Sequence, residues 1–230
     1  MSYFLKKFVC LSKSRKIGGF CFAGKEILKN GDIGEWLRPV SDREDEEISH
    51  NECKYEDDCL PELLDIIEVP FKKPNPTCHQ CENYLIDDGY CWEKVGNFNR
   101  EDLNLLLDSP DVLWGSNNSS YYGINDRVDE CFLENLDNSL YFITPTSLSI
   151  DVITEGKEFN NPRRKVRARL IYNEKNYLLP VTDPDIEKRY LKKEDGQYIF
   201  RNPESRVFIC VSMGKPHQGY CWEFVASVIK

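Results

Sequence analysis

Short runs of aliphatic, β-branched and aromatic residues recur along the chain, separated by glycine, proline and polar residues that are typical of turns. In the first half this pattern predicts strands at residues 3–11, 19–28, 35–40 and 63–69. In the second half it predicts strands at residues 139–144, 147–153, 165–172, 176–181, 206–212 and 219–229. Many short strands with few helices indicate a mainly β chain (all-β or α+β), built from small barrels or sandwiches rather than a parallel α/β sheet.

The segments between the strands carry weaker patterns. Residues 12–18 are expected to form a long basic loop that ends in the turn signal Gly18-Gly19. Residues 42–60 show no period and are expected to form an acidic excursion loop. Residues 78–98 mix cysteine, histidine, aromatic residues and glycine, and we expect them to be irregular apart from a short strand at residues 83–86.

One short helix is predicted in each half of the chain. In the first half the helix is predicted at residues 99–107. Asn99 is a good N-cap, and acidic residues follow it in the first turn. In the second, Asp183-Pro184 places a cap before a proline at the first helical position, which predicts a helix to about Leu191. A strand at residues 63–69 is expected to be ended by Pro70, Pro74 and Pro76.

A chain of 230 residues suits two small domains or one large one. It contains no apolar run of the length that spans a membrane, and its start does not resemble a signal peptide, so we expect a cytoplasmic location and no membrane partner. The ten cysteines are then expected to be reduced thiols.

Charge is distributed unevenly along the chain. Residues 42–68 hold twelve Asp or Glu against Arg43 and Lys54, so this segment accounts for −10 of a total of −9 and the remainder sums to +1. Basic residues concentrate at residues 1–30 and 163–169. A locally basic surface can attract phosphate groups despite an acidic total.

The clearest candidate for such a surface is the strand around residue 167. Alternation along a strand places Lys165, Arg167 and Arg169 on one face and apolar residues on the other. A cationic row on a sheet is one way in which an OB barrel holds single-stranded nucleic acid. The alternative is a solvated outer face, paired with the acidic segment.

A second basic group lies in the first half. Arg15 and Lys16 stand among serines, and Lys25 follows on the next predicted strand, which suits phosphate contacts or a plain basic hairpin tip. Trp36 and Arg38 share one face of the third predicted strand. Trp36 could stack a base, or it could belong to the core.

The chain offers weak signals for metal or catalytic chemistry. Cys78 and Cys81 form a Cys-x-x-Cys pair that could supply two ligands to zinc, but no second pair follows. The three histidines form no nucleophile elbow or triad pattern with a serine. The sequence therefore predicts no enzyme activity and no resident cofactor, with zinc as the weaker alternative.

Short motifs in a fixed order resemble the dual OB-containing domain family. They are residues 10–16, 23–26, 36–41 and 64–67, the run His79-Gln80-x-Glu82-Asn83, and then residues 113–114, 167–169, 177–184, 209–216 and 225–229. The position of Cys81 is commonly proline in that family, which argues against zinc. The resemblance leaves two roles open for His79, Gln80, Glu82 and Asn83, namely structural hydrogen bonds or recognition of a ligand.

The resemblance implies two OB-like barrels joined by loops. We expect the first barrel, with its acidic insertion, at residues 1–98, a helix and loop connector at residues 99–138, and the second barrel at residues 139–230. It further implies a non-enzymatic module that binds nucleic acid or nucleotide as an accessory or sensing part of a prokaryotic anti-phage defence system. The alternative is a regulatory subunit that docks through its barrels or acidic loop on a protein encoded in the same operon.

Overall fold

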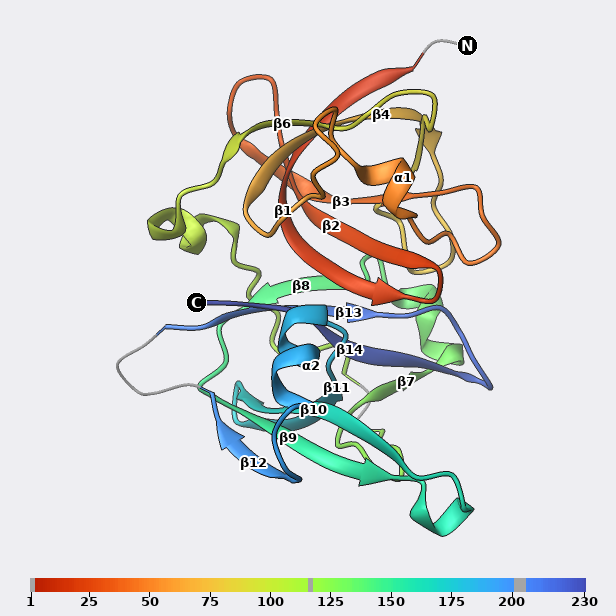
Figure 1. Cartoon of the computed structure of the whole chain (residues 1–230), viewed down its shortest axis with the longest axis vertical. Coiled ribbons are helices and arrows are strands. Elements are labelled where there is room, and N and C mark those ends of the chain that lie inside the picture. Colours follow the sequence, from red (N-terminus) through yellow and green to blue (C-terminus); the bar gives the residue numbers. More distant parts are fainter. Residues whose placement is uncertain (1–2, 116–117, 201–205) are drawn as a thin grey trace. The chain divides into compact units, whose positions relative to one another are not determined.

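The computed structural model describes residues 3–115, 118–200 and 206–230 and confirms a mainly β chain with two OB-like barrels (Figure 1). The chain divides into two compact units. Unit 1 comprises the residues up to Leu107 together with Asp137–Ser139, and unit 2 comprises Asp108–Leu136 and Leu140–Lys230. The predicted connector at residues 99–138 is therefore divided between the units. None of the helices within the described ranges is long and apolar enough to cross a membrane.

Unit 1 is a five-stranded barrel with one added strand. Strand β1 (Phe4–Lys16) pairs with β2 (Gly19–Ile27) and, through its first half, with β4 (Asp65–Pro74). Strand β3 (Ile33–Val40) joins β2 to β5 (Asn83–Ile86), which returns to β4. The pairing of β3 with β5 is parallel, and the order β1-β2-β3-β5-β4-β1 closes an OB barrel. Strand β6 (Glu93–Asn97) extends the sheet beyond β4.

Two expectations about where the strands of unit 1 end are wrong. The residues predicted as a basic loop continue β1 to Lys16, which pairs with Gly19 and leaves only Ile17 and Gly18 in the turn. The strand persists because its charges find partners: Lys13 lies 2.9 Å from Glu62, and Lys16 donates to the carbonyl of Asp45. Strand β4 likewise continues past Pro70, whose carbonyl accepts a hydrogen bond from the backbone N–H of Asp87.

The acidic segment is part of the barrel rather than an excursion. It contains helix α1 (His50–Cys53), which begins with a capping box between Ser49 and Glu52. Ile48 exchanges two backbone hydrogen bonds with Phe20, at 2.8 and 2.9 Å. Ile48 and Cys53 are fully buried in the core of unit 1, so the segment closes one end of the barrel.

Unit 2 repeats the barrel with its first strand split in two. Strand β8 (Leu140–Ile143) pairs with β13 (Phe208–Met213), and β9 (Ser147–Glu155) pairs with β10 (Arg163–Tyr172). Strand β11 (Lys175–Pro180) follows β10, and β14 (Tyr220–Ile229) pairs with β13. A parallel bridge between Val181 and Val225 closes the circuit at the position where unit 1 joins β3 to β5.

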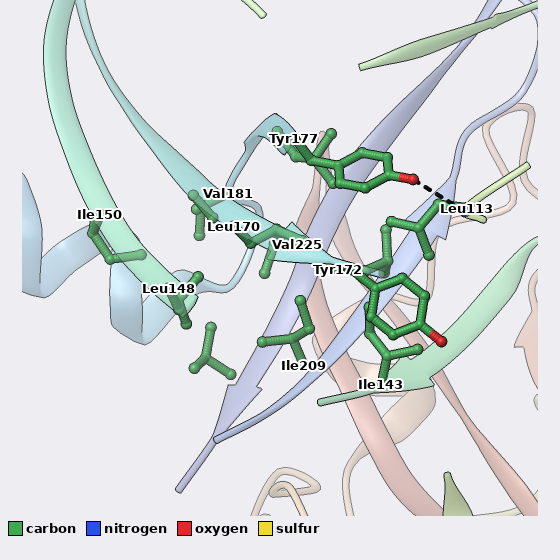
Figure 2. Close-up of a cluster of buried hydrophobic side chains, with 14 of the residues drawn as sticks. Leu113, Ile143, Leu148, Ile150, Leu170, Tyr172, Tyr177, Val181, Ile209 and Val225 are labelled. Atoms are coloured by element: carbon green, nitrogen blue, oxygen red, sulfur yellow. Dashed lines mark hydrogen bonds between the residues drawn. The ribbon is translucent and has the colours of Figure 1, made fainter. Parts of the chain in front are cut away.

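The core of unit 2 draws one apolar face from each strand. Figure 2 shows Leu148, Leu170, Ile209 and Val225 converging from β9, β10, β13 and β14. The hydroxyl of Tyr177 accepts a hydrogen bond from the backbone N–H of Leu113 at 3.3 Å, so the one polar atom of this buried ring has a partner (Figure 2).

The remaining elements of the two units are short. The predicted cap at Asn99 is confirmed, ahead of a 3-10 helix (Arg100–Leu106) in unit 1. Helix α2 (Pro184–Tyr190) confirms the second helix. Six elements among the described residues escaped prediction: α1, β6, β7 (Arg127–Asp129), β12 (Gly196–Ile199) and two 3-10 helices (Glu130–Asn135 and Lys157–Phe159). Residues 116 and 117 of the predicted connector lie outside the described residues.

Asp183 anchors α2 to the barrel. Its Oδ1 accepts from the backbone N–H groups of Asp185 and Ile186 at 3.0 Å, and its Oδ2 accepts from Val228 of β14, also at 3.0 Å. One carboxylate thus caps the helix and satisfies a strand amide.

We expect Asp183→Ala to lower the free energy of unfolding by about 2–4 kcal/mol, the sum of a lost cap and a lost charged hydrogen bond. Asp185→Ala is the control and should cost less than about 1 kcal/mol, since Asp185 is exposed in the first turn. Urea denaturation measures both, and equal losses would contradict the anchoring role.

Candidate nucleic-acid interface

The predicted cationic row lies on β10 as expected, but it is not an open surface. Val166, Ala168 and Leu170 face the core, which confirms the alternation. The pairing of β10 with β9 sets Arg167 beside Asp151, and the Nε of Arg167 lies 2.6 Å from Glu155. Arg169 lies 2.8 Å from Asp151 and is 42% exposed. Carboxylates of the neighbouring strand therefore neutralise much of the row.

A segment ahead of β7 covers Arg167 further. Ile124 exchanges two backbone hydrogen bonds with Leu178 of β11, at 2.9 and 3.4 Å. This places the fully buried Asp126 with its Oδ2 at 3.4 Å from Arg167, while Ser120 donates to the same carboxylate from its backbone and its hydroxyl. Arg167 is 6% exposed, which corrects the expectation that it lies open to phosphate. Lys165 is half-buried and Arg169 remains at the surface.

In unit 1 the structure brings Arg38 together with the polar motif. Because β3 and β5 run parallel, Arg38 pairs in register with Asn83, beside Glu82. The Nη2 of Arg38 lies 3.0 Å from Glu82 and donates to the hydroxyl of Ser139 at 2.7 Å, and Ser139 donates to Glu82. We call Arg38, Glu82 and Ser139 the buried triad. Arg38 is 4% exposed, so it too is closed to phosphate in this conformation.

The rest of the polar motif shapes the loop between β4 and β5. Thr77 and Gln80 exchange two backbone hydrogen bonds across a turn in which Cys78 is left-handed, with a φ of 47°. The amide nitrogen of Asn83 donates to Thr77 at 3.3 Å and to Gln80 at 3.4 Å. His79 is fully buried in the same loop. These contacts are hydrogen bonds of the structural kind, and recognition of a ligand by the motif stays a prediction.

The other predicted residues of unit 1 lie as follows. Arg15 is exposed near the β1–β2 turn, and Lys16 is half-buried. The Nζ of Lys25 lies 4.9 Å from the centre of the Trp36 ring, and Trp36 is 7% exposed. The ammonium group of Lys25 thus lies against the Trp36 ring, and little of that ring is exposed to solvent.

Cys78 and Cys81 are exposed and joined only by a hydrogen bond from the thiol of Cys81 to the carbonyl of Cys78 at 3.7 Å. All ten cysteines are free thiols. Within the described ranges, no group of three or more His, Cys, Asp or Glu is placed to hold a metal ion.

An aromatic surface on β14 was not predicted. Tyr220, Trp222 and Phe224 alternate with the buried residues Cys221 and Glu223, so the three rings share the outer face and are partly exposed. We call them the aromatic ladder. The sequence signal was present, since Tyr-x-Trp-x-Phe has the period of a strand and Lys215 precedes it closely.

The basic group that completes this surface comes from β7. Pairing of β7 with β14 sets Arg127 opposite Trp222. The guanidinium carbon of Arg127 lies 3.9 Å from the centre of the Tyr220 ring and 5.8 Å from that of Trp222. Lys215 and His217 are exposed on the loop between β13 and β14, which leads directly into the ladder. In an OB barrel this loop joins the fourth and fifth strands and commonly contacts oligonucleotides.

Glu223 lies on the inner face of the same strand. It is 2% exposed, and its Oε2 has no hydrogen-bond partner among the described residues. Burial raises the pKa of Glu223 well above its ordinary value, and the nearby Asp126 adds to the effect. Its environment therefore favours the protonated, neutral form of the side chain.

Residues 6–228 of the chain match the dual OB-containing domain family. No curated protein and no solved structure is found to match the chain.

The buried triad gives a stability prediction. Removing Arg38 leaves the Glu82 carboxylate buried without its counter-ion, so Arg38→Met should lower the free energy of unfolding of unit 1 by about 3–5 kcal/mol. The double variant Arg38→Met/Glu82→Leu should recover most of that loss, because it removes both charges together. Guanidinium denaturation of the three proteins gives the comparison. A double variant no more stable than Arg38→Met would contradict the pairing.

Glu223 gives a pH prediction. Its folded pKa exceeds its unfolded pKa, so between the two the unfolded chain binds fewer protons than the folded chain and stability falls as pH rises. Glu223→Gln should remove this component, and its melting temperature should exceed that of the wild type at pH values above the unfolded pKa. The difference should shrink as pH falls through the ordinary range of a glutamate. Thermal melts across that range measure it, and a difference that does not depend on pH would contradict the assignment.

Proposed function

Because the chain belongs to the dual OB-containing domain family, we propose that it binds single-stranded nucleic acid, with bases stacking on the aromatic ladder of unit 2. The observation that carries this proposal is the row Tyr220, Trp222 and Phe224, partly exposed on one strand face and flanked by Arg127. A base must leave its duplex partner to stack on such a row, which favours single strands.

The physical case is one of stacking joined to local charge. Every base has a π-face, so a row of aromatic rings binds without strict sequence preference, at about 1–3 kcal/mol per stacked base. Arg127 lies over the Tyr220 ring and offers a planar cation to a base or a phosphate. Lys215 and His217, exposed on the adjoining loop, are placed to follow a phosphate backbone.

The residues predicted from the sequence take different parts in this proposal. Arg38 and Arg167 hold buried carboxylates and stabilise the barrels. Lys165 and Arg169 on β10, and Arg15 and Lys25 in unit 1, keep their predicted role as phosphate contacts outside the ladder. Binding to nucleotides, the lack of enzyme activity and a place in prokaryotic defence stay predictions from the family resemblance.

Binding must show the salt dependence of phosphate contacts. With a formal charge of −9, the chain as a whole repels nucleic acid, so attraction has to come from the local basic groups. Such contacts release counterions, and the affinity falls as salt rises. Stacking itself is much less sensitive to salt.

We expect the chain to bind labelled single-stranded DNA or RNA at low salt, and Trp222→Ala to weaken that binding by about 5- to 150-fold. Tyr121→Ala is the matched control, because Tyr121 is exposed in the same unit but contacts Tyr122 and Phe159 instead of the ladder. Fluorescence anisotropy at rising salt measures both variants. The proposal fails if neither nucleic acid binds at low salt, or if Trp222→Ala and Tyr121→Ala bind alike.

A further inference from the structure

A groove in unit 1 lies between two walls. One wall is the last part of the acidic segment, Tyr55–Glu62, and the other is formed by residues 89–96, which include the start of β6. The groove has a volume of about 1150 Å³. This is large enough for several side chains of a bound peptide, and it shares no residue with the aromatic ladder.

The groove carries negative charge. Among the described residues that line it, one cation, Lys94, stands against five carboxylates: Glu56, Asp57, Glu62, Asp65 and Glu93. Lys94 lies 2.6 Å from Asp65, and Lys13 lies 2.9 Å from Glu62, so these two acids already have counter-ions. No ion pair joins Glu56, Asp57 or Glu93 to a cation among the described residues. Their charge is therefore not offset by a cation among the described residues.

A second observation concerns donors that lack partners. Trp92 lines the groove, is 1% exposed, and has no acceptor for its indole N–H among the described residues. Strand β6 pairs with β4 alone among the described strands, so it forms the edge of its sheet. An edge strand presents backbone N–H and C=O groups that an extended peptide can bind.

The rim of the groove combines these groups with an aromatic ring. Tyr90 is 51% exposed and can cover the aliphatic part of a long basic side chain or hold its charge over the ring. Val95 is the extra residue of a bulge in β6. The bulge interrupts the regular hydrogen bonding of β6 and limits strand pairing to a short stretch. The edge thus accepts a short peptide segment rather than a long strand.

We infer that this groove docks an extended segment of a partner protein that is rich in arginine or lysine. The carboxylates of Glu56, Asp57 and Glu93 pair with its cations, and the β6 edge binds its backbone. Nucleic acid is excluded from the groove, because its phosphates would face uncompensated carboxylates. This docking site is independent of the nucleic-acid site proposed for unit 2 and uses different residues.

A labelled peptide that alternates arginine and valine is a suitable probe, with a glutamate–valine peptide as its counterpart. The full chain should bind the arginine peptide and not the glutamate peptide, with an affinity that falls as salt rises. The triple variant Glu56→Gln/Asp57→Asn/Glu93→Gln should weaken binding about tenfold, because each exposed ion pair contributes modestly.

The control removes the same charge elsewhere in the acidic segment. Asp42, Glu44 and Asp45 are exposed and do not line the groove, so Asp42→Asn/Glu44→Gln/Asp45→Asn should leave the affinity within about twofold. Equal weakening by the two triple variants would overturn the inference, since it would show attraction to net charge alone. Equal binding of the two peptides would overturn it as well. Neither result bears on nucleic-acid binding, which is read separately through Trp222→Ala.

Discussion

Each barrel depends on a parallel contact between its third and fifth strands. In unit 1 this contact runs from Arg38 to Val40 on β3 and from Asn83 to Leu85 on β5. It closes the sheet on itself, removes two strand edges and encloses the hydrophobic core within the barrel. It also determines which side chains meet, since Arg38 reaches Glu82 only because β5 begins beside it. The polar motif of the β4–β5 loop is therefore part of the closure.

A barrel with charged residues on its outer strands must either leave them in water or neutralise them. This chain neutralises several with its own carboxylates, through Glu82 in unit 1 and Asp126, Asp151 and Glu155 in unit 2. Such burial removes the cations from solvent and fixes the loops that carry the acids. The surfaces left for ligands are consequently those where rings or acids remain exposed, namely the aromatic ladder and the groove beside β6.

Most strands and the helix after Asp183 can be predicted from the local sequence, because alternation and capping depend on residues that are close together in the chain. The partner of each buried arginine cannot, since Arg167 pairs with Asp126 and Arg38 donates a hydrogen bond to Ser139 across long stretches of chain. The sequence pattern of a basic row such as that of β10 is the same whether its cations face water or carboxylates. The reverse holds for the aromatic ladder, whose period was visible but whose arginine comes from a distant strand. Short edge strands such as β12 also escape, because only their partner defines them.

The closing contact differs in length between the two barrels. In unit 1 it spans three residue pairs in register, whereas in unit 2 a single bridge between Val181 and Val225 is supported by the Thr182 N–H donating to Val225 at 2.9 Å. A shorter seam has fewer hydrogen bonds to break, so the second barrel opens there at a lower free-energy cost than the first. We therefore expect the amides near β11 and β14 to exchange with solvent through local fluctuation rather than global unfolding. The strand that carries the aromatic ladder thus borders the shorter of the two closing contacts.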